Sequence, residues 1–145
     1  MKAPKRILTI VAAVFAVGAL VRVLFVGVVP SRCDNIPISE SASPDGRLKA
    51  VVFTRDCGSV SGLTTQVSIL ESSSSLLNGP GNAFVADTNH GAISSAPGSG
   101  PEVHVRWQTR YHLFIEYPHG ARGRLVAGEV AGVQIEDASI SHDGV

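Results

Sequence analysis

Two histidines and an arginine form the group of side chains with the clearest potential for chemistry. His104, Arg106 and His112 alternate with apolar residues inside Val103–Tyr117, a span whose pattern predicts a β-hairpin. With a three-residue loop, Arg106 faces His112, and His104 lies diagonal to His112 at the ~7–8 Å typical of diagonal neighbours. Imidazoles at that spacing can share a ligand or transfer a proton. This polar face is therefore the candidate site of the chain.

The same face has a plainer interpretation as a solvated surface. Glu116 is on the same strand as His112, but four residues at ~3.3 Å each separate them by ~13 Å, too far for one metal ion. Two histidines without a third ligand make a poor metal site. The sequence also lacks a G-x-S-x-G elbow, a phosphate-binding glycine loop, an H-E-x-x-H motif and a calcium loop. We therefore predict no catalytic residue, no metal and no cofactor.

The hairpin that carries these side chains is the best-specified element of the sequence. A loop at residues 108–110 places six apolar side chains on one face. The predicted pairs are Trp107 with Tyr111, Val105 with Leu113 and Val103 with Ile115.

A second hairpin surrounds the cysteine at position 57. Ser43–Gly46 has the composition of a β-turn, and Leu48–Thr54 after it is apolar on both faces, which predicts a central strand covered on both sides. Thr64–Leu70 alternates as its return strand. Residues 88–101 read as a loop. Further strand candidates are Ala83–Ala86, Leu125–Val126 and Val130–Ile135.

These segments predict a mainly β domain over residues 43–137. It is a small antiparallel β-sandwich or twisted sheet of six to seven strands, preceded by an N-terminal transmembrane helix. Residues 30–42 are expected to be a linker, and residues 138–145 a polar tail.

The first 29 residues have the pattern of a membrane anchor. Lys2, Lys5 and Arg6 precede the apolar run Ile7–Val29, whose length as a helix is ~34 Å, enough to cross a hydrocarbon core of ~30 Å. The early basic residues favour a cytoplasmic N-terminus. Arg22 interrupts the run about two helical turns before its end, from where its side chain can reach the interface. We expect a single-pass protein of the inner membrane with its C-terminal domain in the periplasm or outside the cell.

Two alternatives to an anchor stay open. Small residues at 17–19 would suit cleavage of a signal peptide, although the chain stays apolar for ten residues after them. A buried core helix is the other alternative.

Two cysteines outside the cytoplasm favour a disulfide. Cys33 and Cys57 enclose a loop whose closure is worth ~3–3.5 kcal/mol in the chain-entropy model. Inert free thiols and a reactive Cys57 are the alternatives, and the neighbouring carboxylate of Asp56 disfavours a reactive thiolate.

The charge distribution argues against nucleic acid as a partner. Four of the twelve Lys and Arg residues, and none of the twelve Asp and Glu residues, lie in the first 29 residues. The remaining chain has eight basic and twelve acidic residues, a net charge of −4. Phosphate binding needs a basic face instead.

Three stretches resemble an uncharacterised bacterial membrane-anchored family of unknown function. They are S-P-D-G-R-L-K-A-V-V-F-T-R-D-C-G, T-T-Q-V-S-I-L and G-N-A-F-V-A-D. The similarity spans Ser43–Tyr117 and includes V-R-W ahead of L-F-I-E-Y-P. Similar members have C-G-A-T-T after the cysteine, where this chain has C-G-S-V-S. The resemblance implies a bacterial envelope protein and carries no assigned activity.

Three functional classes follow from these observations. The first is a binding or structural role for an extracytoplasmic β-domain, with a working surface at Gly58–Gly62 or on the polar face. The second is an envelope hydrolase or metal-dependent enzyme that uses His104 and His112. The third is an accessory subunit of a membrane complex, in which Arg22 pairs with an acidic residue of a neighbouring helix. We favour the first class and expect no enzymatic activity.

Overall fold

The computed structural model describes residues 11, 14–15, 17–18, 33–58 and 62–141. The chain divides into two units, Met1–Arg32 and Cys33–Val145. In the first unit the five described residues are helical. The rest of the predicted anchor at residues 7–29 lies outside the described residues. Among those that are described, no helix is both long enough and apolar enough to cross a membrane.

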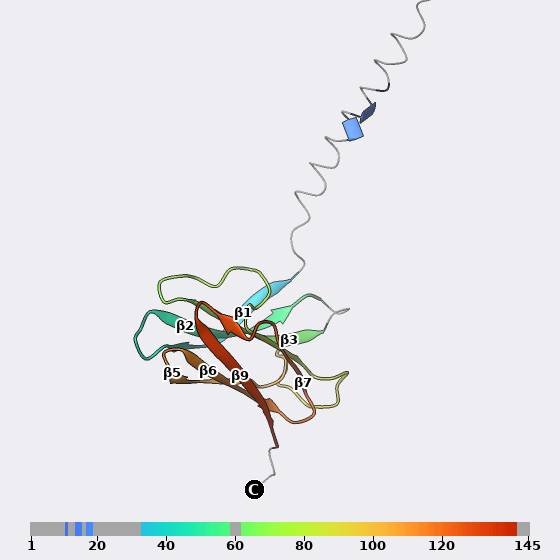
Figure 1. Ribbon diagram of the computed structural model, residues 1–145. Coiled ribbons are helices and arrows are strands. Elements are labelled where there is room, and N and C mark those ends of the chain that lie inside the picture. Colours follow the sequence, from blue (N-terminus) through green and yellow to red (C-terminus); the bar gives the residue numbers. More distant parts are fainter. Residues whose placement is uncertain (1–10, 12–13, 16, 19–32, 59–61, 142–145) are drawn as a thin grey trace, which may run out of the picture. The chain divides into compact units, whose positions relative to one another are not determined.

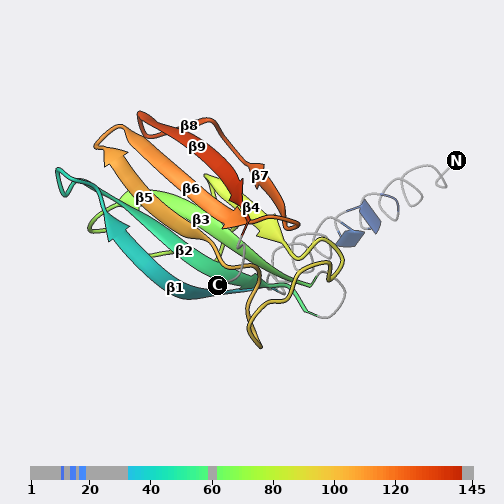
Figure 2. The same cartoon turned by 90° about the horizontal axis from the view of Figure 1, so that it is seen from below.

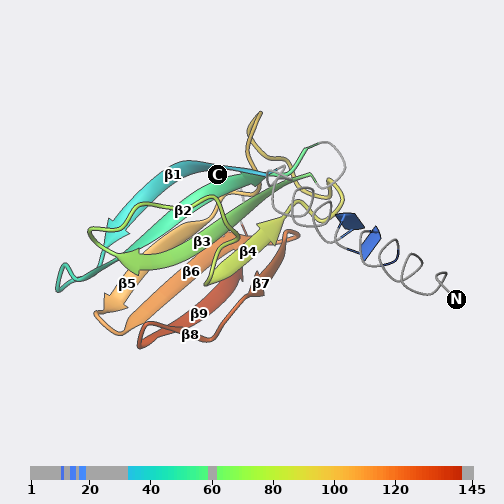
Figure 3. The same cartoon turned by 90° about the horizontal axis from the view of Figure 1, so that it is seen from above.

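The described part of the second unit forms nine strands (Figure 1). Their bounds are β1 Asp34–Ala42, β2 Leu48–Asp56, β3 Leu63–Glu71, β4 Phe84–Asp87, β5 His104–Thr109, β6 His112–Pro118, β7 Arg122–Leu125, β8 Glu129–Val130 and β9 Val133–Ile140. Sheet A has the strand order β1-β2-β3-β4-β7, and sheet B has the order β5-β6-β9-β8. Figures 2 and 3 show sheet A stacked on sheet B, with β1 and β5 at the same side of the stack.

The mainly β prediction is confirmed, but the number of strands and their pairing differ from it. Nine strands are described instead of six or seven, because β1 lies in the expected linker and a turn at residues 131–132 divides the predicted strand Val130–Ile135 into β8 and β9. The pair β6–β9 is parallel, whereas the other described pairs are antiparallel. After β6 the chain crosses to sheet A as β7 and then returns to sheet B as β8 and β9. Because of this crossing, β9 runs beside β6 in the same direction.

Strand β1 lies where the sequence suggested a linker. Asp34–Ala42 pairs with β2 along its whole length, with a β-bulge between Pro37 and Ser39. Its sequence, D-N-I-P-I-S-E-S-A, is mostly polar and contains a proline, which is tolerated on edge strands. At the other end of the domain, β9 runs to Ile140 and extends past the expected boundary at residue 137.

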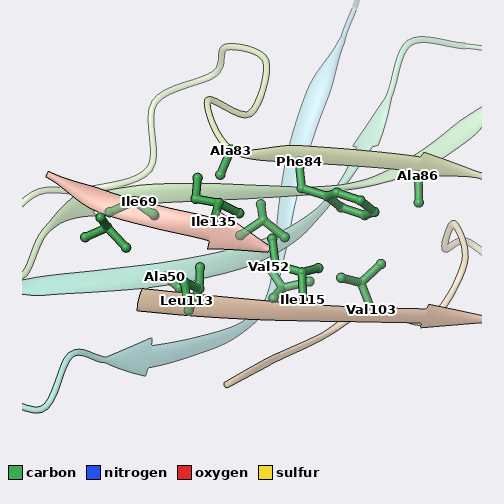
Figure 4. Close-up of a cluster of buried hydrophobic side chains, with 12 residues drawn as sticks. Ala50, Val52, Ile69, Ala83, Phe84, Ala86, Val103, Leu113, Ile115 and Ile135 are labelled. Carbon is green, nitrogen blue, oxygen red and sulfur yellow. The ribbon is translucent and has the colours of Figure 1, made fainter. Parts of the chain in front are cut away.

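The core lies between the two sheets (Figure 4). Sheet A contributes alternate residues of β2, β3 and β4, such as Val52 and Phe84, and sheet B contributes residues of β6 and β9, such as Leu113 and Ile135. The buried set is Ala50, Val52, Val67, Ile69, Ala83, Phe84, Ala86, Val103, Leu113, Ile115, Val133 and Ile135. Every second strand residue points to the opposite face, which explains this selection.

The outer face of sheet A is covered by residues 72–82, which we call the strap. Beneath it, Val51 and Phe53 are fully buried although they point away from the core. The strap is held by main-chain and side-chain hydrogen bonds, such as the one from Gly81 N to Gln66 Oε1 at 2.7 Å. Figure 3 shows this segment, which connects β3 to β4, passing over β2 and β3. The prediction that β2 is covered on both faces is therefore confirmed.

The β5–β6 hairpin has a different register from the predicted one. Trp107 pairs with Leu113 and Val105 with Ile115, which is a slip of two residues. A tight turn at residues 110–111 and a bulge at residue 108 replace the three-residue loop. The turn is stabilised because Tyr111 N donates to Thr109 Oγ1 at 3.1 Å. A slip of two keeps the apolar residues on the same face, so alternation alone cannot detect it.

Candidate functional site

A long loop between β4 and β5 forms one wall of an opening in the domain. The loop is fixed to β3 at residues 100–101, where the Thr65 hydroxyl donates to the Pro101 carbonyl at 2.5 Å. Gly100 lies against the same strand, and a Cβ at this position would be 2.6 Å from Thr65 N. Only glycine allows such a close approach. The end of the loop is thus positioned by the buried face of β3.

The edge strand β1 forms the opposite wall. The bulge places Ile38 out of register with β2, and its side chain is 55% exposed. Further along β1, Trp107 Nε1 of sheet B donates to the Ser41 carbonyl at 3.0 Å. This bond joins the two sheets at Ser41, whereas the cleft opens between them at Ile38 and Ser39.

Between these walls lies a cleft of about 790 Å³. Its apolar lining consists of Ile38, Ile93, Ala96, Pro101, Val103 and Pro118. Serines of the loop, together with Glu102 and His104, supply the polar part of its border. Its volume falls within the ~300–1,000 Å³ typical of ligand pockets. A mainly apolar lining with a few polar groups is also typical of such pockets.

His104 is the predicted site residue that borders this cleft. Its Nε2 lies 3.0 Å from Glu102 Oε1, and both side chains are more than half exposed. The two residues also border a smaller hollow beside Tyr117. Burial, and then the nearby carboxylate of Asp137, raise the pKa of Tyr117, and the phenol is protonated at neutral pH. A protonated phenol beside this hollow can donate a hydrogen bond.

His112 belongs to a different part of the domain. Its Nε2 atom is buried and makes no hydrogen bond within the described part of the chain. The same atom lies 3.3 Å from Glu136 Oε2. The distance suits an ion pair, but the direction from Nε2 to the carboxylate oxygen does not suit a hydrogen bond.

The observed register separates the three residues of the predicted polar-face site. His104 pairs with Glu116, which lies four residues along β6 from His112, or ~13 Å at the usual rise per residue. Arg106 pairs with Phe114 instead of His112, and its guanidinium carbon lies 5.4 Å from the centre of that ring. The three side chains share a face of sheet B but do not form one site. The described residues also contain no cluster of three or more metal-binding side chains.

The disulfide prediction is confirmed. Cys33 and Cys57 are bonded to each other, and neither cysteine is free. The bond joins the start of β1 to the end of β2, so it holds the first residue of the domain to its central hairpin. The neighbouring loop Gly58–Gly62, a predicted working surface, has residues 59–61 outside the described part.

Comparison with protein-family models, with curated proteins and with solved structures found no match to this chain. The resemblance to an uncharacterised bacterial family therefore stays a prediction.

The cleft was not predicted, because its residues come from three separate parts of the chain. Ile38 lies in the expected linker, Ile93 in the expected loop, and Pro118 directly after the predicted hairpin Val103–Tyr117. One local signal was present: Ile36 and Ile38 are the apolar residues of an otherwise mostly polar stretch, and both are exposed. Exposed neighbouring isoleucines on a strand indicate a surface that contacts something else.

Proposed function

We propose that this chain is a membrane-anchored bacterial envelope protein whose extracytoplasmic β-sandwich binds an apolar ligand in the cleft between β1 and the β4–β5 loop. The observation that carries the binding role is the apolar lining of that cleft around Ile38, Ile93 and Val103. Apolar surface that is removed from water stabilises a complex by roughly 25 cal/mol per Å². An apolar ligand that displaces water from this cleft is therefore bound favourably.

Two observations support the proposed location. The sequence begins with basic residues followed by the apolar run Ile7–Val29, as in a signal anchor with a cytoplasmic N-terminus. The Cys33–Cys57 disulfide directly after this run suits an oxidising compartment. Alkaline phosphatase fused after residue 145 should be active in intact bacteria, and the protein should resist extraction by carbonate. A full-length fusion that is inactive in intact bacteria would contradict this topology.

A binding role also agrees better with the geometry than a hydrolytic one. A hydrolase would need His104 and His112 to act together, and the register of β5 and β6 keeps them apart. We therefore propose binding and not hydrolysis for this domain.

The single tryptophan of the chain provides a direct test of ligand binding. Trp107 lies at the edge of the sandwich next to β1, so it can transfer excitation energy to a fluorescent ligand in the cleft. The neutral probe N-phenyl-1-naphthylamine would be added to the full chain in lipid nanodiscs. Empty nanodiscs provide the blank.

We expect Ile38→Glu to remove most of the tryptophan-sensitised emission, because a carboxylate would enter the apolar lining. Leu77→Glu is the matched control, since Leu77 is 80% exposed and lies on the strap. Equal emission from both variants and the parent chain would refute the cleft as the binding site.

A further inference from the structure

Strand β1 has a free edge beside the cleft. In the described part of the chain, β2 is the only strand that forms a ladder with β1, and Figures 2 and 3 show β1 as the outermost strand of sheet A. An edge strand presents N–H and C=O groups with which another extended chain can pair. The residues that supply such groups can be identified from the ladder.

The direction of each main-chain group follows from one hydrogen bond. Ser43 N donates to Leu48 O at 2.8 Å, so Ser43 faces β2. Alternate residues of an antiparallel strand face the same way. Ser41 therefore also faces β2, while Ala42 and Glu40 point their N–H and C=O groups away from it. Both residues are exposed, and neither makes a further main-chain hydrogen bond in the described structure.

The free edge is limited to a short stretch. Pro37 has no N–H, and the bulge that follows it interrupts the ladder. Both features protect natural edge strands against unlimited pairing. The groups of Glu40 and Ala42 can thus bond a segment of a few residues, and an extended sheet cannot form there.

The cleft lies where the inward side chains of an added strand would point. Ser39 and Ser41 alternate with Glu40 and Ala42, so they face the inner side of sheet A, and Ser39 borders the cleft. A residue placed opposite Ser39 would point to the same side, next to Ile38. An apolar side chain at that position would enter the apolar part of the cleft.

The charge of the border favours a basic segment. Glu102 borders the cleft with a side chain that is 65% exposed, and residues 30–145 have a net charge of −4. A lysine or arginine beside the apolar residue would be attracted to the Glu102 carboxylate.

We propose that this cleft is a peptide-recognition site: an extended basic-apolar segment adds to sheet A beside β1, bonds to the main chain of Glu40 and Ala42, and inserts one apolar side chain into the cleft. This inference rests on the proposed function, because it names the ligand class of the same site. Main-chain bonds supply affinity in such strand addition, and the side-chain pocket supplies specificity.

The test uses labelled pentapeptides and the full chain in nanodiscs. The probes are fluorescein-labelled Lys-Val-Thr-X-Lys, with Val, Ile, Leu or Phe at X, and binding is followed by fluorescence anisotropy. We expect at least one of them to bind. Methylation of the threonine nitrogen in the best peptide should weaken binding by about tenfold or more, because the donor to β1 is lost.

A pair of variants tests the same bond from the protein side. Glu40→Pro removes an outward N–H without touching the ladder to β2, so it should weaken binding by about tenfold or more. Glu40→Gln keeps the N–H and should change affinity by less than about threefold. Thermal melting checks that both variants fold, and the methylated peptide gives an independent result with the unaltered protein.

The outcomes separate this inference from the proposed function. Peptide binding that is insensitive to both N-methylation and Glu40→Pro would overturn strand addition. If no peptide binds but the naphthylamine probe still does, the peptide inference is wrong and the apolar cleft stands. If neither binds, the proposed function fails as well.

Discussion

The side chain of Asn35 connects β1, β2 and the strap, and its removal gives the most detailed stability prediction. Its Nδ2 donates to the carbonyls of Leu77 and Gly79 at 3.0 and 2.7 Å, and its Oδ1 accepts from Arg55 at 2.7 Å. Asn35→Ala removes all three bonds. The strap then loses its attachment to β1, although its bonds to β3 remain.

The expected loss of stability is about 2–3 kcal/mol. A neutral hydrogen bond contributes about 0.5–1.5 kcal/mol and one to a charged group about 1.5–3 kcal/mol. The full sum does not apply, because the bond to Leu77 is exposed and Arg55 is only partly buried, so water can replace part of what is lost. A loss of about 2 kcal/mol in the local opening of the strap corresponds to about thirtyfold faster exchange of its protected amides.

Native-state hydrogen exchange and urea unfolding provide the two assays. The informative amides are those of Gly81 and Ala83, which donate to Gln66 and Val67. Asn78→Ala is the matched control, because Asn78 lies in the same strap, is exposed and makes no side-chain hydrogen bond in the described structure. We expect exchange to accelerate only in Asn35→Ala. Similar exchange in both variants would refute the role assigned to Asn35.

Three further predictions concern the disulfide, the loop of the cleft and acid stability. Replacing both cysteines by serine should lower the free energy of unfolding by about 3–3.5 kcal/mol, since the bond closes a separation of 24 residues; urea unfolding that reductant leaves unchanged would contradict this. Gly100→Ala should cost about 1–3 kcal/mol by overpacking against Thr65, while Gly128→Ala, with open space around it, should be nearly neutral in the same assay. Burial opposes ionisation of Asp87, but bonds from Arg122 and from Asn89 N outweigh it, so its pKa in the folded state is lowered from 3.8. The stabilisation of the folded state is therefore complete above about pH 3.8 and is lost as the pH falls through the lower pKa of folded Asp87. Asp87→Asn should make the free energy of unfolding depend less on pH in this acid range. An unchanged pH dependence would count against the ion pair.

Strong local patterns explain the parts of the fold that the sequence predicts. β2 is apolar on both faces and follows a turn in which Ser43 Oγ donates to Asp45 at 2.8 Å, so both the strand and its start are encoded locally. β3 has similarly regular alternation. The disulfide was predictable because the chain has two cysteines and a leading apolar segment.

Non-local interactions explain most of what the sequence does not reveal. β1 forms because β2 supplies a complete ladder and a disulfide holds its start, neither of which is visible in a polar stretch with a proline. The hairpin of β5 and β6 shows the limit of alternation, since turn and bulge together decide between registers two residues apart. In the observed register His104 lies farther from His112 than in the predicted one, so the predicted site residues do not meet. The cleft depends on the packing of Gly100 against β3, a contact between distant segments.

Amide chemical-shift mapping is the most direct test of the central claim, that the opening between β1 and the β4–β5 loop is the binding site. The full chain, labelled with ¹⁵N in nanodiscs, would be titrated with N-phenyl-1-naphthylamine. We predict the largest shifts at Ile38, Ile93 and Val103, with little change on the strap. Shifts confined to the strap or to the outer face of sheet B around His112 would contradict the claim.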